Sequence, residues 1–186
     1  MWLIDLVENL LSVTRIEEGR MQIRQSAELV DEVIKEALKH TGQSRTGRTI
    51  KVEEEDELIL AKMDARLIVQ VLINLIGNAV KYTPQGTDIT VRVKKEKAEN
   101  AERSQVIISV CDLGNGIPDD RKERVFDMFY TGSDQVADSR RSLGLGLGLC
   151  RSIINAHGGK IWISDNIPHG AVVTFTLPAE EVALNE

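Results

Sequence analysis

The sequence is poor in aromatic residues, cysteine and proline, and these shortages exclude several classes of protein. Only 4% of the 186 residues are aromatic, and the chain carries 4 prolines and 2 cysteines. Cys111 and Cys150 lie in apolar surroundings without C-x-x-C spacing, so we expect buried thiols rather than a disulfide framework or a zinc site. With 42% hydrophobic and 28% charged residues, the composition is that of a folded globular domain, not of a disordered or collagen-like chain.

Long apolar runs and an excess of positive charge are also missing. No run approaches the roughly 20 apolar residues that cross a bilayer, and Asp5 and Glu8 interrupt the first apolar segment. Neither a membrane span nor a signal peptide is therefore predicted. The net charge of −6 argues against a nucleic-acid-binding protein, because neutralising phosphates requires a basic surface. The length suits one domain with at most a short appended element.

The apolar periodicity predicts an α/β sandwich of the α+β class. Helices are expected from near Leu3 to before Gly19, from a cap at Ser26 to residue 38, from a cap at Asp64 to Tyr82, at 120–129, and after the glycines at 144–149. Strands are expected at 21–24, 50–53, 58–63, 88–94, 105–111, 160–164 and 171–177. Because hairpins join most of these strands, we expect a mixed, largely antiparallel sheet that helices cover on one face.

The helix expected up to Tyr82 carries a polar stripe. Gln70, Asn74, Asn78 and Lys81 fall within about 80° of arc at 3.6 residues per turn. Asparagine is a poor helix former, but its side-chain oxygen can bind Mg²⁺, and lysine offers a point charge to phosphate. The stripe is therefore a candidate metal and phosphate site, with a solvated helix face as the alternative when the helix is considered alone.

A glycine-rich turn follows an apolar strand and contains Asp112, Gly114, Gly116, Ile117 and Pro118. An ordinary turn has this composition too. The functional alternative places the Asp112 carboxylate in a pocket, where it accepts a hydrogen bond from an exocyclic amine. The glycines would then allow the backbone to approach a ligand closely.

Three further glycines occur at 144–149 (GLGLGL), directly before a helix. Glycine at a helix start destabilises the helix, and exposed backbone amides for a phosphate are the usual reason for it. A dinucleotide-binding GxGxxG motif would need glycine where Leu149 stands, and the sequence has no GxxxxGK[ST] motif. A nucleotide site here is thus neither of the Rossmann nor of the P-loop type.

Together, four motifs resemble, in order, the N, G1, F and G2 boxes of the ATP-binding catalytic domain of bacterial sensor histidine kinases. They are 74–84 (NLIGNAVKYTP), 112–118 (DLGNGIP), 125–130 (VFDMFY) and 144–149 (GLGLGL). The resemblance implies the Bergerat ATP-binding fold of the GHKL proteins, in which ATP lies between helices and sheet under a mobile lid. The C-terminal part, from His157 through 170–178 (GAVVTFTLP), is similar to the potassium-responsive Kdp sensor kinases.

The resemblance also implies a domain organisation. Residues 6–21 (LVENLLSVTRIEEGRM) resemble the end of the second dimerisation helix and the linker after it. We therefore expect 1–20 to be that helix end and linker, and 21–186 to be the ATP-binding domain with a lid at 131–143. The parent protein would be a homodimer in the cell membrane, with this domain in the cytoplasm and no role in nucleic-acid binding.

By motif match, the resemblance assigns roles to single residues. Asn78 would hold Mg²⁺, and Asn74 would lie near the phosphates or the nucleophile. Lys81 would contact phosphate, Tyr82 would stack on adenine, and Asp112 would accept from the adenine amine. The other residues implied to contact ATP are Gly114, Gly116, Ile117, Phe126 and Phe129 at the start of the lid, Gly144, Leu145, Gly146, Leu147, Gly148 and Leu149.

The implied activity is that of a protein-histidine kinase of two-component signalling. Such a domain binds Mg²⁺ and ATP and donates the γ-phosphoryl group to a histidine on the dimerisation domain of the same parent protein, which serves a cognate response regulator. Two alternatives stay open, a hydrolytic ATPase of the same fold and a nucleotide-binding regulatory module without catalysis. Hydrolytic relatives carry a glutamate base one turn before the metal-binding asparagine, where this chain has Asn74.

The three histidines do not resemble phosphoacceptors. His40 is expected near a helix C-terminus, His157 before Gly158, and His169 in a turn. The acceptor histidine is expected on a helix upstream of Met1. The chain alone is therefore expected to be inactive as a kinase.

Overall fold

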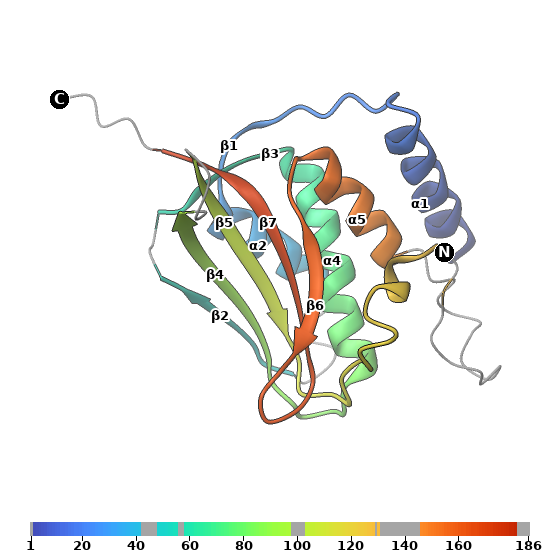
Figure 1. The fold of residues 1–186 in the computed structure, drawn as a ribbon, viewed down its shortest axis with the longest axis vertical. Coiled ribbons are helices and arrows are strands. Elements are labelled where there is room, and N and C mark those ends of the chain that lie inside the picture. The colour runs from blue at the N-terminus through green and yellow to red at the C-terminus, as the bar shows by residue number, and fades with distance from the viewer. Residues whose placement is uncertain are drawn as a thin grey trace.

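The structure is a computed structural model of the chain, and it describes residues 2–41, 48–55, 58–97, 103–128, 130 and 146–181. Figure 1 shows the order of the elements. They are α1 (Trp2–Glu17), β1 (Ser26–Leu29), α2 (Val30–His40), β2 (Ile50–Glu54), β3 (Leu60–Met63), α4 (Ala65–Tyr82), β4 (Ile89–Lys97), β5 (Ser104–Cys111), the 3-10 turn η1 (Arg124–Phe126), α5 (Gly146–Ala156), β6 (Ile161–Asp165) and β7 (Ala171–Glu180).

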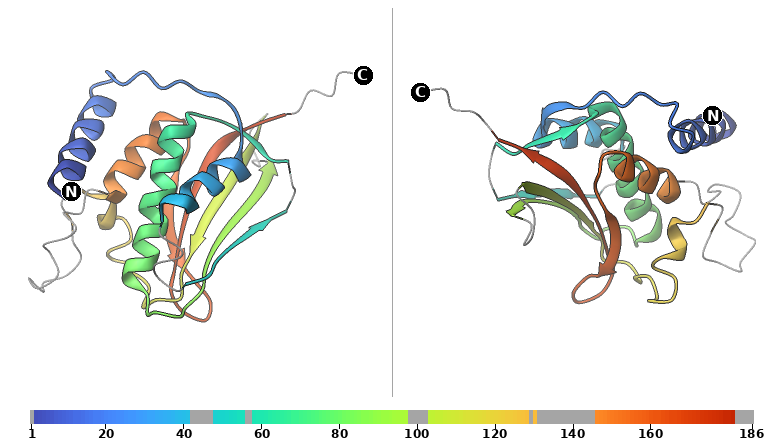
Figure 2. Two further views of the ribbon diagram at one scale, coloured as in Figure 1. Left: turned by 180° about the vertical axis from the view of Figure 1, so that it is seen from behind. Right: turned by 45° about the horizontal axis from the view of Figure 1, so that its top comes forward.

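The strands form one sheet with the order β1-β3-β7-β5-β4-β2, and β6 pairs with β7. Among these described strands, β2 and β4 run parallel, and the other pairs are antiparallel. Helices α2, α4 and α5 lie on one face of the sheet, as the view from behind in Figure 2 shows. The α+β fold predicted from the sequence, with a mixed and largely antiparallel sheet, is confirmed.

The core lies between this sheet and the helices. In β4, Ile89, Val91 and Val93 are buried while Arg92 between them is exposed, because successive strand residues point to opposite faces. Helix α4 covers the centre of the sheet and contacts both α2 and α5. Its buried residues recur at helical spacing and are Leu67, Ile68, Val71, Leu72, Leu75, Ile76 and Ala79.

Both ends of α4 are held by buried polar groups. At the N-terminus, the Asp64 carboxylate does not cap the helix, but accepts from the backbone N–H of Arg24 (3.2 Å) and from Arg66 (3.3 Å). Burial opposes ionisation of this carboxyl, but these hydrogen bonds outweigh it and hold the Asp64 pKa below its usual range. At the C-terminus, the buried Arg48 donates to the hydroxyl of Thr83 and to its carbonyl oxygen (2.6 Å).

Three local predictions are wrong. Ser26 does not cap a helix, because it begins β1, where its hydroxyl bonds to Glu28 (2.6 Å), and α2 starts only after Leu29. The strand predicted at 21–24 is absent from that described segment. The helix predicted at 120–129 is a turn followed by η1 in the described residues up to 128. These short segments take their conformation from neighbouring elements, which outweigh local propensity.

Helix α1 lies along α5, at the edge of the domain (Figure 1). Ile16 near its end packs against the core, whereas Ile4, Val7, Leu10 and Leu11 are exposed. An exposed apolar seam of this kind is typical of a helix that packs on another helix. In the described part of the chain, no helix combines the length and apolar character needed to span a membrane.

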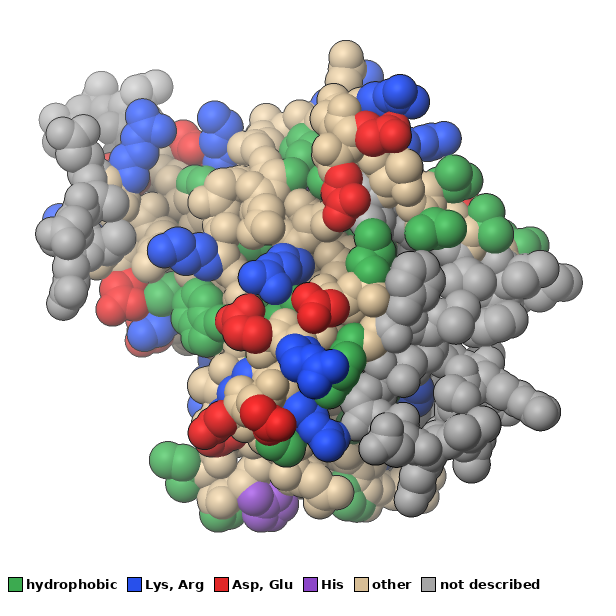
Figure 3. All heavy atoms as spheres, turned by 45° about the vertical axis from the view of Figure 1, so that its right-hand side comes forward, with side chains coloured by type: hydrophobic (Ala, Val, Ile, Leu, Met, Phe, Trp, Pro, Cys, Tyr) green, Lys and Arg blue, Asp and Glu red, His purple; other side chains and the backbone are tan. Residues whose placement is uncertain are grey.

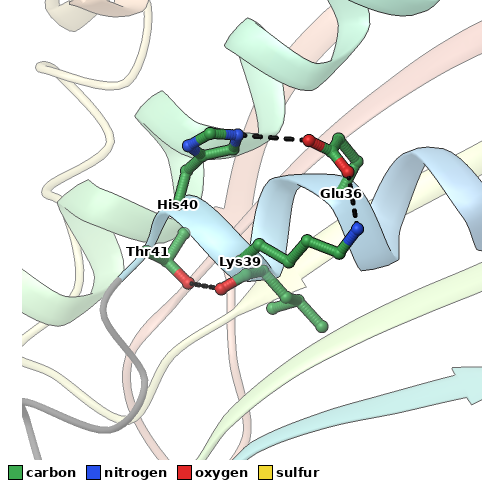
Figure 4. A network of polar contacts seen from close by, with 5 residues as sticks. Glu36, Lys39, His40 and Thr41 are labelled. Carbon is green, nitrogen blue, oxygen red and sulfur yellow. Dashed lines mark hydrogen bonds and ion pairs between the residues drawn. The ribbon is translucent and has the colours of Figure 1, made fainter.

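The histidines take different structural positions. His157 is buried, with Nε2 accepting from the Asp64 backbone N–H (3.0 Å) and Nδ1 donating to the Ile153 carbonyl (2.7 Å), so it joins the end of α5 to the start of α4. His40 lies on the exposed side of α2, where Nε2 is 3.2 Å from Glu36 Oε1 (Figure 4). The interpretation of both as structural or exposed residues is confirmed.

These positions predict unequal effects of the same substitution. His157→Ala should lower the free energy of unfolding by about 2 kcal/mol, because it leaves the buried Asp64 backbone N–H without a partner and removes the side-chain donor to the Ile153 carbonyl. The control His40→Ala should change it by less than about 0.5 kcal/mol. Urea denaturation followed by circular dichroism measures both, and equal effects would contradict the structural role of His157.

Candidate functional site

The polar stripe of α4 lies partly in the interior and partly at the surface. Asn74 and Asn78 are half-buried, while Lys81 and Tyr82 are exposed at the C-terminal end of the helix. The Lys81 ammonium lies 5.1 Å from the centroid of the Tyr82 ring. Tyr82 is 59% exposed, so a face of its ring is open to a ligand.

Asn74 carries an unsatisfied buried atom. Its side-chain Nδ2 is buried and has no hydrogen-bond partner among the described residues. A buried amide without a partner is destabilising and rare in folded proteins, and a functional role is one of the explanations for it. Helix α5 begins directly opposite, since a Cβ on Gly146 would lie 3.9 Å from Asn74 Oδ1. The first predicted motif, 74–84, and the fourth, 144–149, are therefore neighbours.

Cys150 follows Gly146 by one turn in α5 and is buried. Burial raises the pKa of its thiol to about 12, an effect that the nearby Asn74 amide opposes. The thiol approaches the Val71 carbonyl oxygen (3.8 Å). Cys111 is buried as well, and both cysteines are free, so the prediction of two buried thiols is confirmed.

Asp112 follows β5 and has one carboxylate oxygen engaged. Oδ1 accepts from the backbone N–H groups of Gly114 (2.9 Å) and Ala171 (3.1 Å). Oδ2 accepts no hydrogen bond from the residues that the structure describes. The carboxylate is thus fixed in orientation and keeps an oxygen available to a donor on a ligand.

The Asp112 turn packs against the end of α4. A Cβ on Gly114 would lie 3.0 Å from the Tyr82 carbonyl oxygen and 3.1 Å from Thr83 Cγ2. Gly116 has a φ of 73°, a conformation that glycine adopts without strain. The close approach at Gly114 brings the carboxylate of Asp112 and the ring of Tyr82 to the same end of the domain.

The segment after this turn is fastened to its neighbours by charged side chains. Lys122 pairs with Asp119 and with Asp165 of β6 (2.9 Å), and Arg151 of α5 pairs with Glu123 (3.4 Å). Figure 3, which brings the side with α5 and β6 forward, shows acidic and basic side chains intermixed on this surface. The pairs hold the segment before the predicted lid on α5 and β6.

An apolar contact holds the same segment. Phe126 is buried, and the Arg151 guanidinium lies 5.4 Å from the centroid of its ring. A Cβ on Gly148 would lie 3.2 Å from the Phe126 carbonyl oxygen, so the chain after η1 contacts the first turn of α5. Ile117 and Leu147 pack against the small cluster that Phe126 forms with Ile163 and Ala171.

The structure thus brings the described residues of all four motifs into neighbouring positions around the C-terminal half of α4. Leu149 is a fully buried core residue, so its side chain is packed away from any ligand. Phe129, Gly144, Leu145 and the predicted lid at 131–143 lie outside the described residues. A hollow of about 500 Å³ at the end of α1 involves Leu11 and other residues outside the predicted site.

Sequence reasoning missed several residues that shape this region. Arg48 anchors the end of α4 through Thr83, and Lys122 fastens the segment before the predicted lid. Asn166 and His169 contact the Asp112 turn. These contacts join residues between 35 and 55 positions apart, and periodicity within one element carries no signal of them.

Comparisons with known proteins agree with this arrangement. A family model described as histidine kinase-, DNA gyrase B- and HSP90-like ATPase matches residues 63–181. The sensor protein KdpD of Clostridium acetobutylicum is 41% identical over 179 residues, which are 96% of this chain and 19% of that protein. The chain therefore corresponds to about a fifth of this relative.

Two solved structures of the histidine kinase ThkA are also similar. Its nucleotide-free catalytic domain is 31% identical, with a TM-score of 0.69, over 83% of this chain and 95% of that one. ThkA in complex with the response regulator TrrA is 28% identical, with a TM-score of 0.71, over 96% of this chain and 49% of that one.

The two glycines of α5 predict different outcomes of the same substitution. Gly148→Ala should lower the free energy of unfolding by about 1–3 kcal/mol, because the added methyl group crowds the chain at Phe126. Gly146→Ala adds a methyl group at an ordinary contact distance and should change it by less than about 1 kcal/mol. Urea denaturation compares the two, and a larger loss for Gly146→Ala would contradict the described packing.

Proposed function

Because the chain belongs to the family of histidine kinase-, DNA gyrase B- and HSP90-like ATPases, we propose that it binds ATP with Mg²⁺ and donates the γ-phosphoryl group to a histidine. The acceptor histidine would lie on a dimerisation domain of the same parent protein. One observation carries the proposal within the site. The free oxygen of Asp112 lies at one end of α4, and the unsatisfied amide of Asn74 faces the glycine-rich start of α5.

The adenine end of the site would be formed by Asp112 and Tyr82. Asp112 Oδ2 would accept a hydrogen bond from the exocyclic amine, because Oδ1 is already engaged by two backbone donors. The exposed ring of Tyr82 would stack on the base. Gly114, Gly116 and Ile117 would line this end, with the absence of a side chain at Gly114 keeping the turn close to α4.

The phosphate end would be formed by α4 and the start of α5. The exposed Lys81 supplies positive charge, and the first backbone N–H groups of α5 supply the donors that helix N-termini offer to phosphate. The half-buried Asn78 would hold Mg²⁺ through its side-chain oxygen. Bound Mg²⁺ neutralises phosphate charge and is usually held by few protein ligands together with phosphate oxygens and water. This fits the described residues, which include no group of three or more His, Cys, Asp or Glu able to hold a metal.

Transfer to histidine is favoured over hydrolysis by the residue at position 74. Activation of water calls for a general base, and the asparagine amide does not accept a proton at neutral pH. The ATPase family described above includes gyrase B-like and HSP90-like members, but KdpD is a sensor protein and ThkA a histidine kinase. A nucleotide-binding module without catalysis is the remaining candidate, and a phosphotransfer assay separates it from a kinase.

The proposal extends to partners and location. A response regulator is the proposed downstream partner, since ThkA is known in complex with TrrA. The exposed apolar residues of α1 support packing against another helix in a homodimeric parent. We place the domain in the cytoplasm, where ATP is available, and the parent protein in the cell membrane.

The site assignment predicts two losses of nucleotide affinity. Asp112→Asn replaces an acceptor of the adenine amine, and Asn78→Ala removes a metal ligand, so each should weaken binding of ATP in the presence of Mg²⁺ by about 1–3 kcal/mol. Titration calorimetry measures this. The exposed Asp120 provides the control Asp120→Asn, which should bind as the wild type does. Wild-type affinity in the Asp112 and Asn78 variants would refute the assignment.

The proposed transfer also predicts that this chain alone acquires no phosphate. His157 is buried and both of its ring nitrogens are hydrogen-bonded, while His40 and His169 contact Glu36 and Gly114. Phosphoryl transfer needs a nucleophile in line with the γ-phosphate. After incubation with γ-labelled ATP, acid-labile label should appear only on a separately supplied dimerisation domain that contains the acceptor helix.

Two results would contradict this mechanism. One is acid-labile label on the chain itself. The other is hydrolysis of ATP by the chain alone at an ordinary enzyme rate of about 1 per second or more. The variant Asn74→Glu provides a comparison, because it restores a carboxylate base at that position and should raise hydrolysis above the wild-type level.

A further inference from the structure

We infer that Asn166 and His169, in the hairpin between β6 and β7, are positioning residues that orient Asp112 and thereby set the preference of the site for an adenine base. The inference rests on the proposed ATP site. It adds residues that lie outside the four motifs and about 54 positions away from Asp112 in sequence.

The hairpin contacts Asp112 at three of its polar groups. The Asn166 side-chain Nδ2 donates to the Asp112 carbonyl oxygen (2.8 Å). The Asp112 backbone N–H donates to the Ala171 carbonyl oxygen (2.9 Å), and the Ala171 N–H donates to Asp112 Oδ1 (3.1 Å). The backbone and one carboxylate oxygen of Asp112 are thus all held by the segment from Asn166 to Ala171, and Oδ2 is left for a ligand.

Asn166 is itself held in one orientation. Its Oδ1 accepts from the Ile167 N–H (2.9 Å), and its backbone N–H donates to the Gly170 carbonyl oxygen (3.0 Å). Because Oδ1 is bonded to a donor, the amide nitrogen must face the Asp112 carbonyl. Asn166 is half-buried, and its bond to the Asp112 carbonyl oxygen is partly buried, whereas the bond from Ile167 is exposed.

The other end of the turn is held by His169. Its Nδ1 donates to the Gly114 carbonyl oxygen (2.9 Å), while the Gly114 N–H donates to Asp112 Oδ1 (2.9 Å). Gly170 between the two contacts has a φ of 112°, and a Cβ there would overlap the Asp112 carbonyl oxygen. The hairpin therefore lies against the backbone of the turn, and its two side chains hold the turn at both ends.

This arrangement predicts an effect on base recognition rather than on nucleotide binding in general. Loss of the Asn166 bond leaves the Asp112 carbonyl oxygen without this donor and loosens the turn, so that the carboxylate is held less firmly toward the amine. A triphosphate that carries the same sugar and phosphates but lacks the 6-amino group does not use that contact. Purine riboside triphosphate has this structure, so a comparison with ATP isolates the orientation of Asp112.

The experiment measures the dissociation constants of both nucleotides for the full chain in the presence of Mg²⁺. Asn166→Ala should weaken ATP binding about fivefold, and purine riboside triphosphate binding less than about twofold. Asn166→Asp keeps the acceptor for Ile167 but cannot donate to the Asp112 carbonyl, so it should lose at least as much ATP affinity. His169→Ala should likewise weaken binding of ATP more than binding of purine riboside triphosphate.

The controls separate this inference from the function on which it rests. Ser164→Ala, at an exposed position of β6, should leave both affinities unchanged. Asp112→Asn should abolish the preference for ATP, and failure to do so would overturn the adenine assignment itself. If Asp112→Asn acts as expected but Asn166→Ala and Asn166→Asp weaken both nucleotides equally, or neither, the positioning role is refuted. Thermal denaturation of each variant establishes that it is folded.

Discussion

The burial of one side of α4 fixes the direction of every polar residue on that helix. Seven of its residues are packed in the core, and the helix is held between the sheet, α2 and α5. Rotation about its axis would expose apolar surface, which costs about 25 cal/mol per Å². Asn74 and Asn78, one turn apart, therefore keep their direction whether or not a ligand is bound.

Packing of the helices in the core also explains why the site tolerates two locally unfavourable features. Asn74 has a buried amide nitrogen without a partner among the described residues, and α5 begins with glycines that weaken a helix. Core residues such as Leu149, Ile153 and Ile154 hold α5 in place despite this start. A ligand with oxygen acceptors would satisfy the unpaired donors, so these defects are stable in the folded domain and reduced on binding.

The secondary structure of segments whose apolar residues recur at a regular spacing could be predicted from the sequence. That of short segments next to other elements could not. The long apolar period up to Tyr82 and the alternation at 88–94 and 105–111 correspond to α4, β4 and β5. The start of α2 was missed because β1 passes directly into the helix at Leu29, which has no side-chain cap. In the site, the motifs predicted which side chains gather, but the contacts of Asn166 join parts of the chain that are adjacent only in the folded sheet.

The register of the strands connects the contact between Asn166 and Asp112 to the core. In the pairing of β5 with β7, Val110 lies opposite Val173 and Cys111 opposite Val172, which places Asp112 beside Ala171. The register is fixed because Val106, Ile108 and Val110 must face the helices, and a slip by one residue would turn them to the other side. The core-facing residues of β5 thus determine where the hairpin meets the Asp112 turn. Orientation of the carboxylate is in this way also a consequence of core packing, transmitted through two neighbouring strands and added to the contact from Gly114 within the motif.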